Sequence, residues 1–288
     1  MTFKKSATTP ILIATLGMFF FSMMDAVMKA QALGLGTYNA VFWRMLLGAV
    51  FASLLYFPSG PQWPNLRALK IHLTRGTVAA VMAYLFFFGL TRVPLAQAIG
   101  LSFIAPIIAL VLVAPLLGEQ VGPNCKFAAF LGFAGVLVVL SGELSASVSD
   151  IDLMGALSIL TSAVFYAFNL VLQRMQALIA SPLEITFYQN SIVFLLLLLG
   201  APFLAVLPDK AMLWGGSALA AALAILSLVL MSAAYRQAEA KRLLVIEYTA
   251  FIWAAALGWI FFSESLSGNT IAGTFLIVLG CFISARDK

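Results

Sequence analysis

Long apolar segments joined by short polar connections fill almost the whole chain. Each segment has roughly the twenty residues that an α-helix needs to cross the hydrocarbon core of a bilayer. The pattern therefore predicts an all-α integral membrane protein with ten transmembrane helices. These are expected at residues 11–31, 38–57, 71–91, 94–116, 125–142, 153–174, 183–207, 213–236, 242–262 and 269–285.

The ninth apolar segment repeats the pattern of the fourth at a spacing of 145 residues. At this spacing Glu264 falls on Glu119 (264 − 119 = 145) and Leu257 falls on Leu112. Two halves of five spans each would cross the membrane in opposite directions, and such inverted repeats are typical of carriers that open alternately to the two sides. The expected division is a first five-helix repeat at 1–142, an acidic linker at 143–152 and a second five-helix repeat at 153–288.

Composition supports a membrane protein, since 63% of the residues are hydrophobic, only 9% are charged and the mean hydropathy is +1.06. This leaves too little polar surface to cover a soluble globule. The net charge of +5 comes from basic residues scattered singly or in pairs over the connections. They do not form the basic patch of a nucleic-acid-binding protein.

The basic residues are distributed unequally between the two sides of the membrane. If the N-terminus is cytoplasmic, the opposite side holds only Arg92 and Lys210. Connections rich in Lys and Arg stay in the cytoplasm, so both chain ends are expected there. The basic residues on that side would be Lys4, Lys5, Arg67, Lys70, Arg75, Lys126, Arg174, Arg236, Lys241, Arg242, Arg286 and Lys288.

Glu247 is the one formal charge in the apolar part of the ninth span. An ionisable residue at such a depth costs free energy and usually faces the protein interior. Glu247 would accept a substrate ammonium group or a proton from a cavity. Alternatively, it is held by Lys241, Arg242 or a neighbouring helix.

Asp25, Lys29 and Arg44 form a second group of charges within the spans. Asp25 and Lys29 are spaced i,i+4 on the first span, and Arg44 of the second span lies near them in depth. One interpretation is a structural cluster that locks the outer ends of two helices. The other is that Asp25 is a titrating coupling residue, a role that pairing with Lys29 would oppose.

Uncharged polar and aromatic residues within the spans indicate a cavity near the middle of the membrane. Gln97, Asn169, Gln189 and Asn190 need protein or water partners there, and each suits helix–helix bonding as well as a ligand. Buried tyrosines also need a partner, which makes them better cavity candidates than phenylalanines. The predicted substrate-binding residues are Tyr84, Phe103, Tyr166, Phe168, Asn169, Tyr188, Gln189, Glu247 and Tyr248.

Helix bends and ends supply the remaining candidates. Pro106 lies in the middle of the fourth span, where it removes a backbone hydrogen bond and is expected to kink the helix. Glu119 and Glu264 stand just past the fourth and ninth spans and are expected to belong to the caps of the hairpins that follow. The coupling or gating candidates are therefore Asp25, Lys29, Arg44 and Pro106.

No catalytic or cofactor-binding pattern is found in the sequence. It has no GxxxxGK[ST] nucleotide loop and no HExxH metal motif. His72, the only histidine, is expected to be solvated in a cytoplasmic connection. We therefore expect no enzymatic activity, no cofactor and no metal site.

Three motifs resemble the EamA repeats of the drug/metabolite transporter superfamily. They are LxxxxPxxxxxxxxxLLGE at Leu101–Glu119, IEYTAFIWAAALGWIFFSE at Ile246–Glu264, and FWRMLLG at Phe42–Gly48. The second half departs from the first, with Gln189 in the place of Arg44 and Phe251 in the place of Pro106. This predicts that the two gates are unequal.

The resemblance implies a carrier in the bacterial inner membrane, similar to exporters of aromatic amino acids. The expected substrate is an aromatic or other apolar amino acid, or a similar small amphiphilic metabolite, and a monomer is the expected state. One alternative is a carrier of the same fold for nucleosides, sulfonium compounds or cationic drugs. Another is a membrane assembly partner that transports nothing.

Overall fold

The computed structural model describes residues 8–60, 63–118, 121–144, 153–244, 246–264 and 268–285, and this part of the chain contains helices and no strands. The α-helices are α1 (Thr8–Leu35), α2 (Thr37–Tyr56), α3 (Leu66–Leu90), α4 (Leu95–Ser102), α5 (Ile104–Leu117), α6 (Pro123–Leu144), α7 (Leu153–Ala177), α8 (Pro182–Leu198), α9 (Ala201–Leu204), α10 (Ala211–Gln237), α11 (Ala240–Leu243), α12 (Ala250–Phe262) and α13 (Gly268–Ala285). Two short 3-10 helices, η1 (Phe57–Ser59) and η2 (Ile246–Thr249), complete them.

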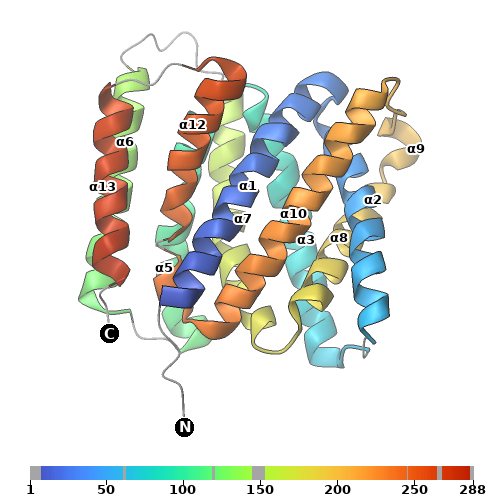
Figure 1. Cartoon of the computed structure of the whole chain (residues 1–288), viewed down its shortest axis with the longest axis horizontal. Helices are drawn as coiled ribbons and strands as arrows, with labels where there is room; N and C mark the ends of the chain where they lie inside the picture. Colours follow the sequence, from blue (N-terminus) through green and yellow to red (C-terminus); the bar gives the residue numbers. More distant parts are fainter. Residues whose placement is uncertain are drawn as a thin grey trace.

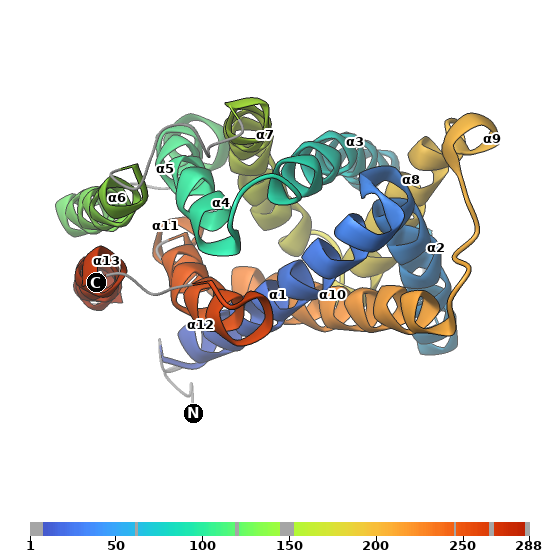
Figure 2. The same ribbon diagram turned by 90° about the horizontal axis from the view of Figure 1, so that it is seen from above.

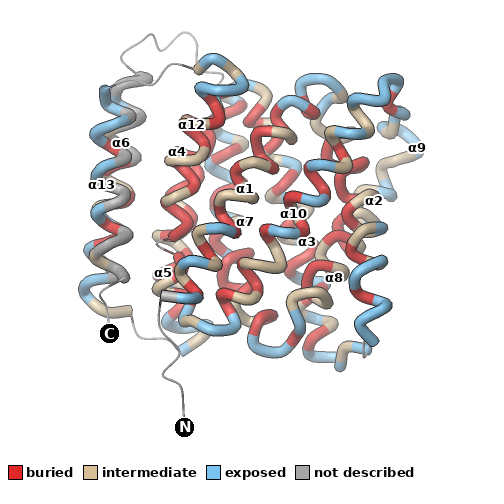
Figure 3. The backbone as a smooth tube through the Cα atoms, viewed as in Figure 1, coloured by how far each residue is buried: buried red, intermediate tan, exposed pale blue. Residues whose placement is uncertain are grey.

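Seven helical segments of the described chain are long and apolar enough, by length and composition, to cross a membrane. They are the predicted first, second, third, fourth, sixth, eighth and ninth spans, and shorter apolar helices lie in the fifth and seventh. Buried positions face the inside of the bundle, whereas large apolar side chains such as Leu54 and Phe203 are exposed on its outside (Figure 3). An apolar outer surface fits contact with lipid.

The helices of the two halves begin at positions that differ by a constant number of residues. The starts of α7 and α1 differ by 145 residues (153 − 8 = 145), as do those of α8 and α2, α10 and α3, α11 and α4, and α13 and α6. The Thr8 end of α1 and the Ala285 end of α13 lie on the same side of the molecule (Figure 1). Below, this side is called the lower face and the opposite side the upper face, as drawn in Figure 1.

The helices of each half pack mainly against helices of the other half. The first helix of each half packs on the third helix of the other half, so that α1 lies along α10 and α7 lies along α3. Helices α2 and α8 pack on each other, as do α6 and α13 at one end of the bundle (Figure 2). Swapping the two halves leaves this set of contacts unchanged. The chain therefore has the arrangement of a two-fold inverted repeat.

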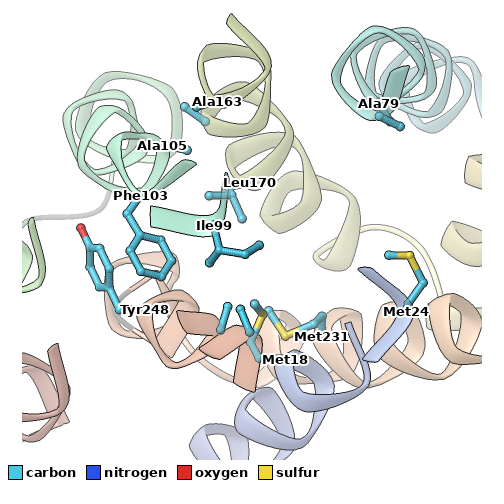
Figure 4. Packing of buried hydrophobic residues seen from close by; sticks show 14 of the residues in the cluster. Met18, Met24, Ala79, Ile99, Phe103, Ala105, Ala163, Leu170, Met231 and Tyr248 are labelled. Carbon is cyan, nitrogen blue, oxygen red and sulfur yellow. The ribbon is translucent and has the colours of Figure 1, made fainter. Parts of the chain in front are cut away.

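The fourth and ninth spans are both interrupted. The fourth is divided into α4 and α5 at Phe103, and the ninth into α11, η2 and α12. Phe103 and Tyr248 occupy equivalent positions (248 − 103 = 145), and their rings meet edge to face with centroids 4.9 Å apart. The two breaks thus touch each other through these two rings (Figure 4).

The interruption of the fourth span lies directly before Pro106. Proline has no N–H to donate to the carbonyl oxygen of Ser102, four residues earlier, and the helix is interrupted at Phe103, between these two residues. Pro106 lies in the first turn of α5, where the backbone N–H that proline lacks has no intrahelical partner in any case. In the second half the break occurs with Phe251 at this place.

Candidate functional site

A cavity lies between the two halves, bounded by helices α1, α2, α3, α7, α8 and α10 and by the broken spans. The space free of protein atoms in it and at its mouth is about 1070 Å³.

Equivalent positions of the two halves face this cavity. The lining residues include ten pairs in which each member of the second half follows its counterpart by 145 residues. The pairs are Met18 and Ala163, Phe21 and Tyr166, Met24 and Asn169, Arg44 and Gln189, Met45 and Asn190, Ala79 and Ala224, Met82 and Ser227, Ala83 and Leu228, Phe86 and Met231, and Ser102 and Glu247. The cavity is therefore built at the interface between the repeats, where carriers of this architecture bind their substrates.

Four ionisable side chains line the cavity: Asp25, Arg44, Arg75 and Glu247. None is more than 6% exposed. The hydroxyl of Tyr166 donates a hydrogen bond to Oε2 of Glu247, and the guanidinium of Arg44 lies over the ring of Phe87, 5.8 Å from its centroid.

Several polar atoms of the cavity have no hydrogen-bond partner among the described residues. They are both carboxylate oxygens of Asp25, Nε of Arg44, Oε1 of Gln189 and Oε1 of Glu247. Buried polar groups in proteins normally have partners. These atoms are thus available to a molecule bound in the cavity.

Below the cavity, a chain of hydrogen bonds joins α3, α7 and α8. Arg75 donates from Nε to Oδ1 of Asn169 at 3.0 Å and from Nη1 to Oε1 of Gln176 at 2.6 Å. Nε2 of Gln176 lies 2.8 Å from Nδ1 of His72, and Nε2 of His72 lies 3.1 Å from Oε1 of Glu184. The prediction that His72 is solvated is wrong, because its side chain is 0% exposed.

Toward the upper face, Lys29 and Glu264 form an ion pair between the two halves. Nζ of Lys29 lies 2.9 Å from Oε1 of Glu264 and donates to the carbonyl oxygen of Val93 at 3.1 Å. The same carboxylate accepts from the backbone N–H of Leu95 at the start of α4. Lys29 therefore pairs with Glu264 instead of its i−4 neighbour Asp25, and Glu264 caps a helix of the opposite half. Glu119 lies outside the described residues.

The structure brings together six of the predicted site residues in the cavity: Asp25, Arg44, Tyr166, Asn169, Gln189 and Glu247. The others lie elsewhere. Tyr84 and Phe168 are 38% and 42% exposed, Tyr188 stacks on the ring of His72 at 4.6 Å, and Phe103 and Tyr248 pack on each other.

Sequence reasoning missed several cavity residues. Arg75 was assigned to the cytoplasmic side because it lies near the start of a span, yet it points into the bundle. Ser102 and Ser162 carry no distinctive pattern. The sequence analysis also named no methionine, but five of them line the cavity: Met18, Met24, Met45, Met82 and Met231. The repeat itself is the signal that could have identified Ser102, as the counterpart of Glu247.

The model of the EamA-like transporter family matches residues 8–141 and again residues 153–286. The chain belongs to the EamA-like transporter family. Its curated relatives include a pseudopaline exporter of Pseudomonas aeruginosa, 28% identical over 96% of each chain. A riboflavin transporter of Brucella anthropi is 24% identical over 85% of this chain and 86% of the relative. A solved crystal structure shares the fold, with a TM-score of 0.72 and 18% identity over 96% of both chains.

Membership of the EamA family confirms the predicted resemblance and the all-α membrane fold. As an EamA protein the chain is a multi-pass membrane transporter of a small molecule and not an enzyme.

Proposed function

We propose that this EamA protein is a secondary carrier that exports amino acids and similar zwitterionic metabolites. The observation that carries the proposal is the cavity that holds two carboxyl and two guanidinium groups between apolar walls. Opposite charges in one buried site suit a substrate with both an ammonium and a carboxylate group. The direction of transport is proposed by analogy with the relative named as an exporter.

The free polar atoms suggest how the head group would bind. Asp25 and Glu247 are the acceptors for an ammonium group, since carboxylate oxygens of both lack partners among the described residues. Arg44 has a free donor for a carboxylate, and its planar guanidinium suits that shape.

The walls favour a substrate with an apolar part. Methionines are flexible and polarisable, so they adapt to different apolar groups. Three of the four methionines that the first half contributes have polar residues at the equivalent positions of the second half: Met24, Met45 and Met82 correspond to Asn169, Asn190 and Ser227. The apolar part of an amphiphile would thus lie on the methionines of the first half, beside the charged Asp25 and Arg44 that bind its head group. With only one tyrosine in the lining, aliphatic amino acids suit the cavity as well as aromatic ones.

Transport would proceed by alternating access, with the upper closure at Lys29–Glu264 and the lower hydrogen-bond chain released in turn. We place the lower face, with both termini, in the cytoplasm of a bacterial inner membrane, following the distribution of Lys and Arg.

A neutral ring compound is the second candidate, because two of the relatives are named riboflavin transporters. Phe21, Phe86 and Phe87 give the cavity a partly aromatic wall for such a ring. Nucleosides fall in the same class. Sulfonium compounds and cationic drugs fit less well, because two buried guanidinium groups repel them.

Counterflow in proteoliposomes tests the proposal. One labelled amino acid is exchanged against all twenty amino acids, riboflavin and several nucleosides. Amino acids should compete, and removal of either the ammonium or the carboxylate group should abolish competition. Competition by riboflavin or nucleosides alone would establish the second candidate, and no counterflow with any compound would reject both.

A further inference from the structure

The hydrogen-bond chain below the cavity has a direction that its chemistry fixes. A guanidinium can only donate hydrogen bonds, so Arg75 requires the oxygen of the Gln176 amide. The NH₂ group of Gln176 must then point at Nδ1 of His72, which lies 2.8 Å away. An NH₂ group only donates, and therefore Nδ1 of His72 must be an acceptor without a proton.

This direction determines the protonation state of His72. With Nδ1 unprotonated, the ring is neutral and carries its single proton on Nε2. Nε2–H then donates to Oε1 of Glu184 at 3.1 Å. Every group in the chain from Arg75 to Glu184 is satisfied in this one tautomer.

A second proton on the ring is incompatible with the chain as it stands. It would place Nδ1–H of His72 against the NH₂ group of Gln176, donor against donor. Turning the Gln176 amide would relieve this contact but would place its NH₂ group against Arg75. After this turn, Oε1 of Gln176 accepts from Nδ1–H of His72, and Arg75 loses one of its two side-chain acceptors and keeps only Asn169.

The charged and titratable groups around His72 do not remove this conflict. Glu184 and Tyr188 face the ring from α8, and Arg75 lies on the same helix, α3. Helix α7 presents the uncharged Gln176, and Tyr56 of α2 lies beside Tyr188. Glu184 would form an ion pair with a protonated ring through Nε2, so the proton has a place to stay. The conflict is therefore confined to the Gln176 amide, whose oxygen both Arg75 and the protonated Nδ1 require.

A route for the proton exists. The side chain of His72 is 0% exposed, whereas that of Glu184 is 16% exposed. Glu184 lies in the first turn of α8, at the lower face. The carboxylate can therefore exchange protons with the solution on that side and pass them to the buried ring.

We propose that His72 is a positioning residue that holds Arg75 in the cavity when neutral and releases it when protonated from the lower face. Arg75 is then a second group that receives the carboxylate of the substrate, beside Arg44. The role of His72 rests on the proposed function in one respect only, namely that the substrate carries a carboxylate group. The consequence is a carrier whose affinity for carboxylate-bearing substrates falls as the lower face becomes acidic.

The tautomer of His72 can be measured without any substrate. Because His72 is the only histidine of the chain, ¹⁵N-histidine labelling of the full-length protein, carrying a tag free of histidine, gives one pair of ring signals. At neutral pH we expect Nδ1 unprotonated and Nε2 protonated, and on acidification both should carry protons. A neutral ring with its proton on Nδ1, or a doubly protonated ring at neutral pH, would overturn the proposal.

Two substitutions test the coupling to Arg75. In Gln176→Glu the carboxylate accepts from Arg75 and from a protonated Nδ1 alike, so acid no longer breaks the chain. In His72→Gln the amide can accept from Gln176 and donate to Glu184 at every pH. The matched control is Gln237→Glu, which introduces the same charge at an exposed position at the end of α10.

Transport is measured at pH values from about 8 to about 5.5 on the lower face, across the range in which histidine titrates. KM of the unmodified carrier and of Gln237→Glu should rise about tenfold with acid, as expected for a weakened charge-assisted hydrogen bond, with a smaller change in kcat. KM of Gln176→Glu and His72→Gln should stay constant. An equal rise of KM in all four proteins would refute the role of His72. Failure to transport any zwitterion would refute the proposed function but leave the tautomer measurement intact.

Discussion

Asp25 occupies an unusual position for a carboxyl group inside a membrane protein. It is 1% exposed and its two oxygens have no hydrogen-bond partner among the described residues. Lys29, one helical turn away, is engaged with Glu264. An unsatisfied buried polar group lowers stability, and such groups are retained mainly where function needs them. Asp25 is thus the strongest single candidate for contact with a substrate ammonium group.

Asparagine at position 25 tests this contact. Asp25→Asn keeps the shape of the side chain and removes its charge, so the affinity for a zwitterionic substrate should fall about tenfold or more. The measurement is the substrate Kd of the purified protein by calorimetry. Asp209→Asn, the same change at an exposed position, should bind like the unmodified protein. Equal affinities in the two variants would rule out Asp25 as the ammonium site.

At the scale of helices, the two broken spans are the feature that sets the protein apart from a simple bundle. Each break creates helix ends at mid-depth, and Phe103 and Tyr248 fill the point where the breaks meet. Helix α4 is held at its start by Glu264, which arrives from the end of α12 in the other half. A movement of α4 therefore requires the Glu264 contact to open.

Removal of the charge at Glu264 should open the upper face. Glu264→Gln loses the 2.9 Å ion pair with Lys29, whose side chain is only 9% exposed. A cysteine introduced at Ser102, in the cavity, should then react faster with a membrane-impermeant maleimide added to that side. Glu239→Gln serves as control, since it breaks the pair with Lys241 near the lower face. The idea fails if both variants label at the rate of the parent.

The packing behind the break is sensitive to a single methyl group. A Cβ atom at Gly132 of α6 would lie 2.8 Å from the ring of Tyr248, whereas one at Gly215 of α10 would meet nothing within 4 Å. Alanine favours a helix over glycine in both places. Gly215→Ala should therefore raise the melting temperature slightly, and Gly132→Ala should lower it by a few degrees because Tyr248 is displaced. Equal shifts of the melting temperature in the two variants would show that α6 moves and Tyr248 stays in place.

The spans could be predicted because about twenty apolar residues in succession have few alternatives to a membrane helix. The breaks at Phe103 and in η2 could not, since the residues there are as apolar as their neighbours. The sequence also did not show which side of each helix faces the lipid and which faces the cavity. Lipid and protein interior are both apolar, so sequence cannot tell the outward Phe168 from the inward Tyr166, two positions apart on α7. Long-range pairs such as Lys29–Glu264 depend on that same unknown rotation.

At the scale of the whole molecule, the cavity charges and the basic residues of the connections are both consistent with a carrier that has one orientation in the membrane. The predicted linker at 143–152 lies mostly outside the described residues, but the helices on either side repeat at a constant spacing. The Thr8 end of α1 and the Ala285 end of α13 lie at the lower face (Figure 1). The orientation of the chain in the membrane follows from the distribution of Lys and Arg and stays a prediction.

Reporters at the two termini test the orientation. A fluorescent reporter that matures only in the cytoplasm should be bright, and alkaline phosphatase inactive, when fused to either end in bacterial cells. A fusion at the connection between α9 and α10, near Asp209, should give the opposite result. Signals on different sides for the two termini would contradict an even number of crossings and with it the inverted repeat.

The exchange of partners, α1 on α10 and α7 on α3, means that neither half has a core of its own. A polypeptide of half this length could complete the same core only by pairing with a second copy of itself turned upside down. Joining both copies in one gene frees each to change separately. Met24 and Asn169, and likewise Ser102 and Glu247, occupy equivalent positions but differ in chemistry, so a symmetric shell surrounds a cavity with two different sides.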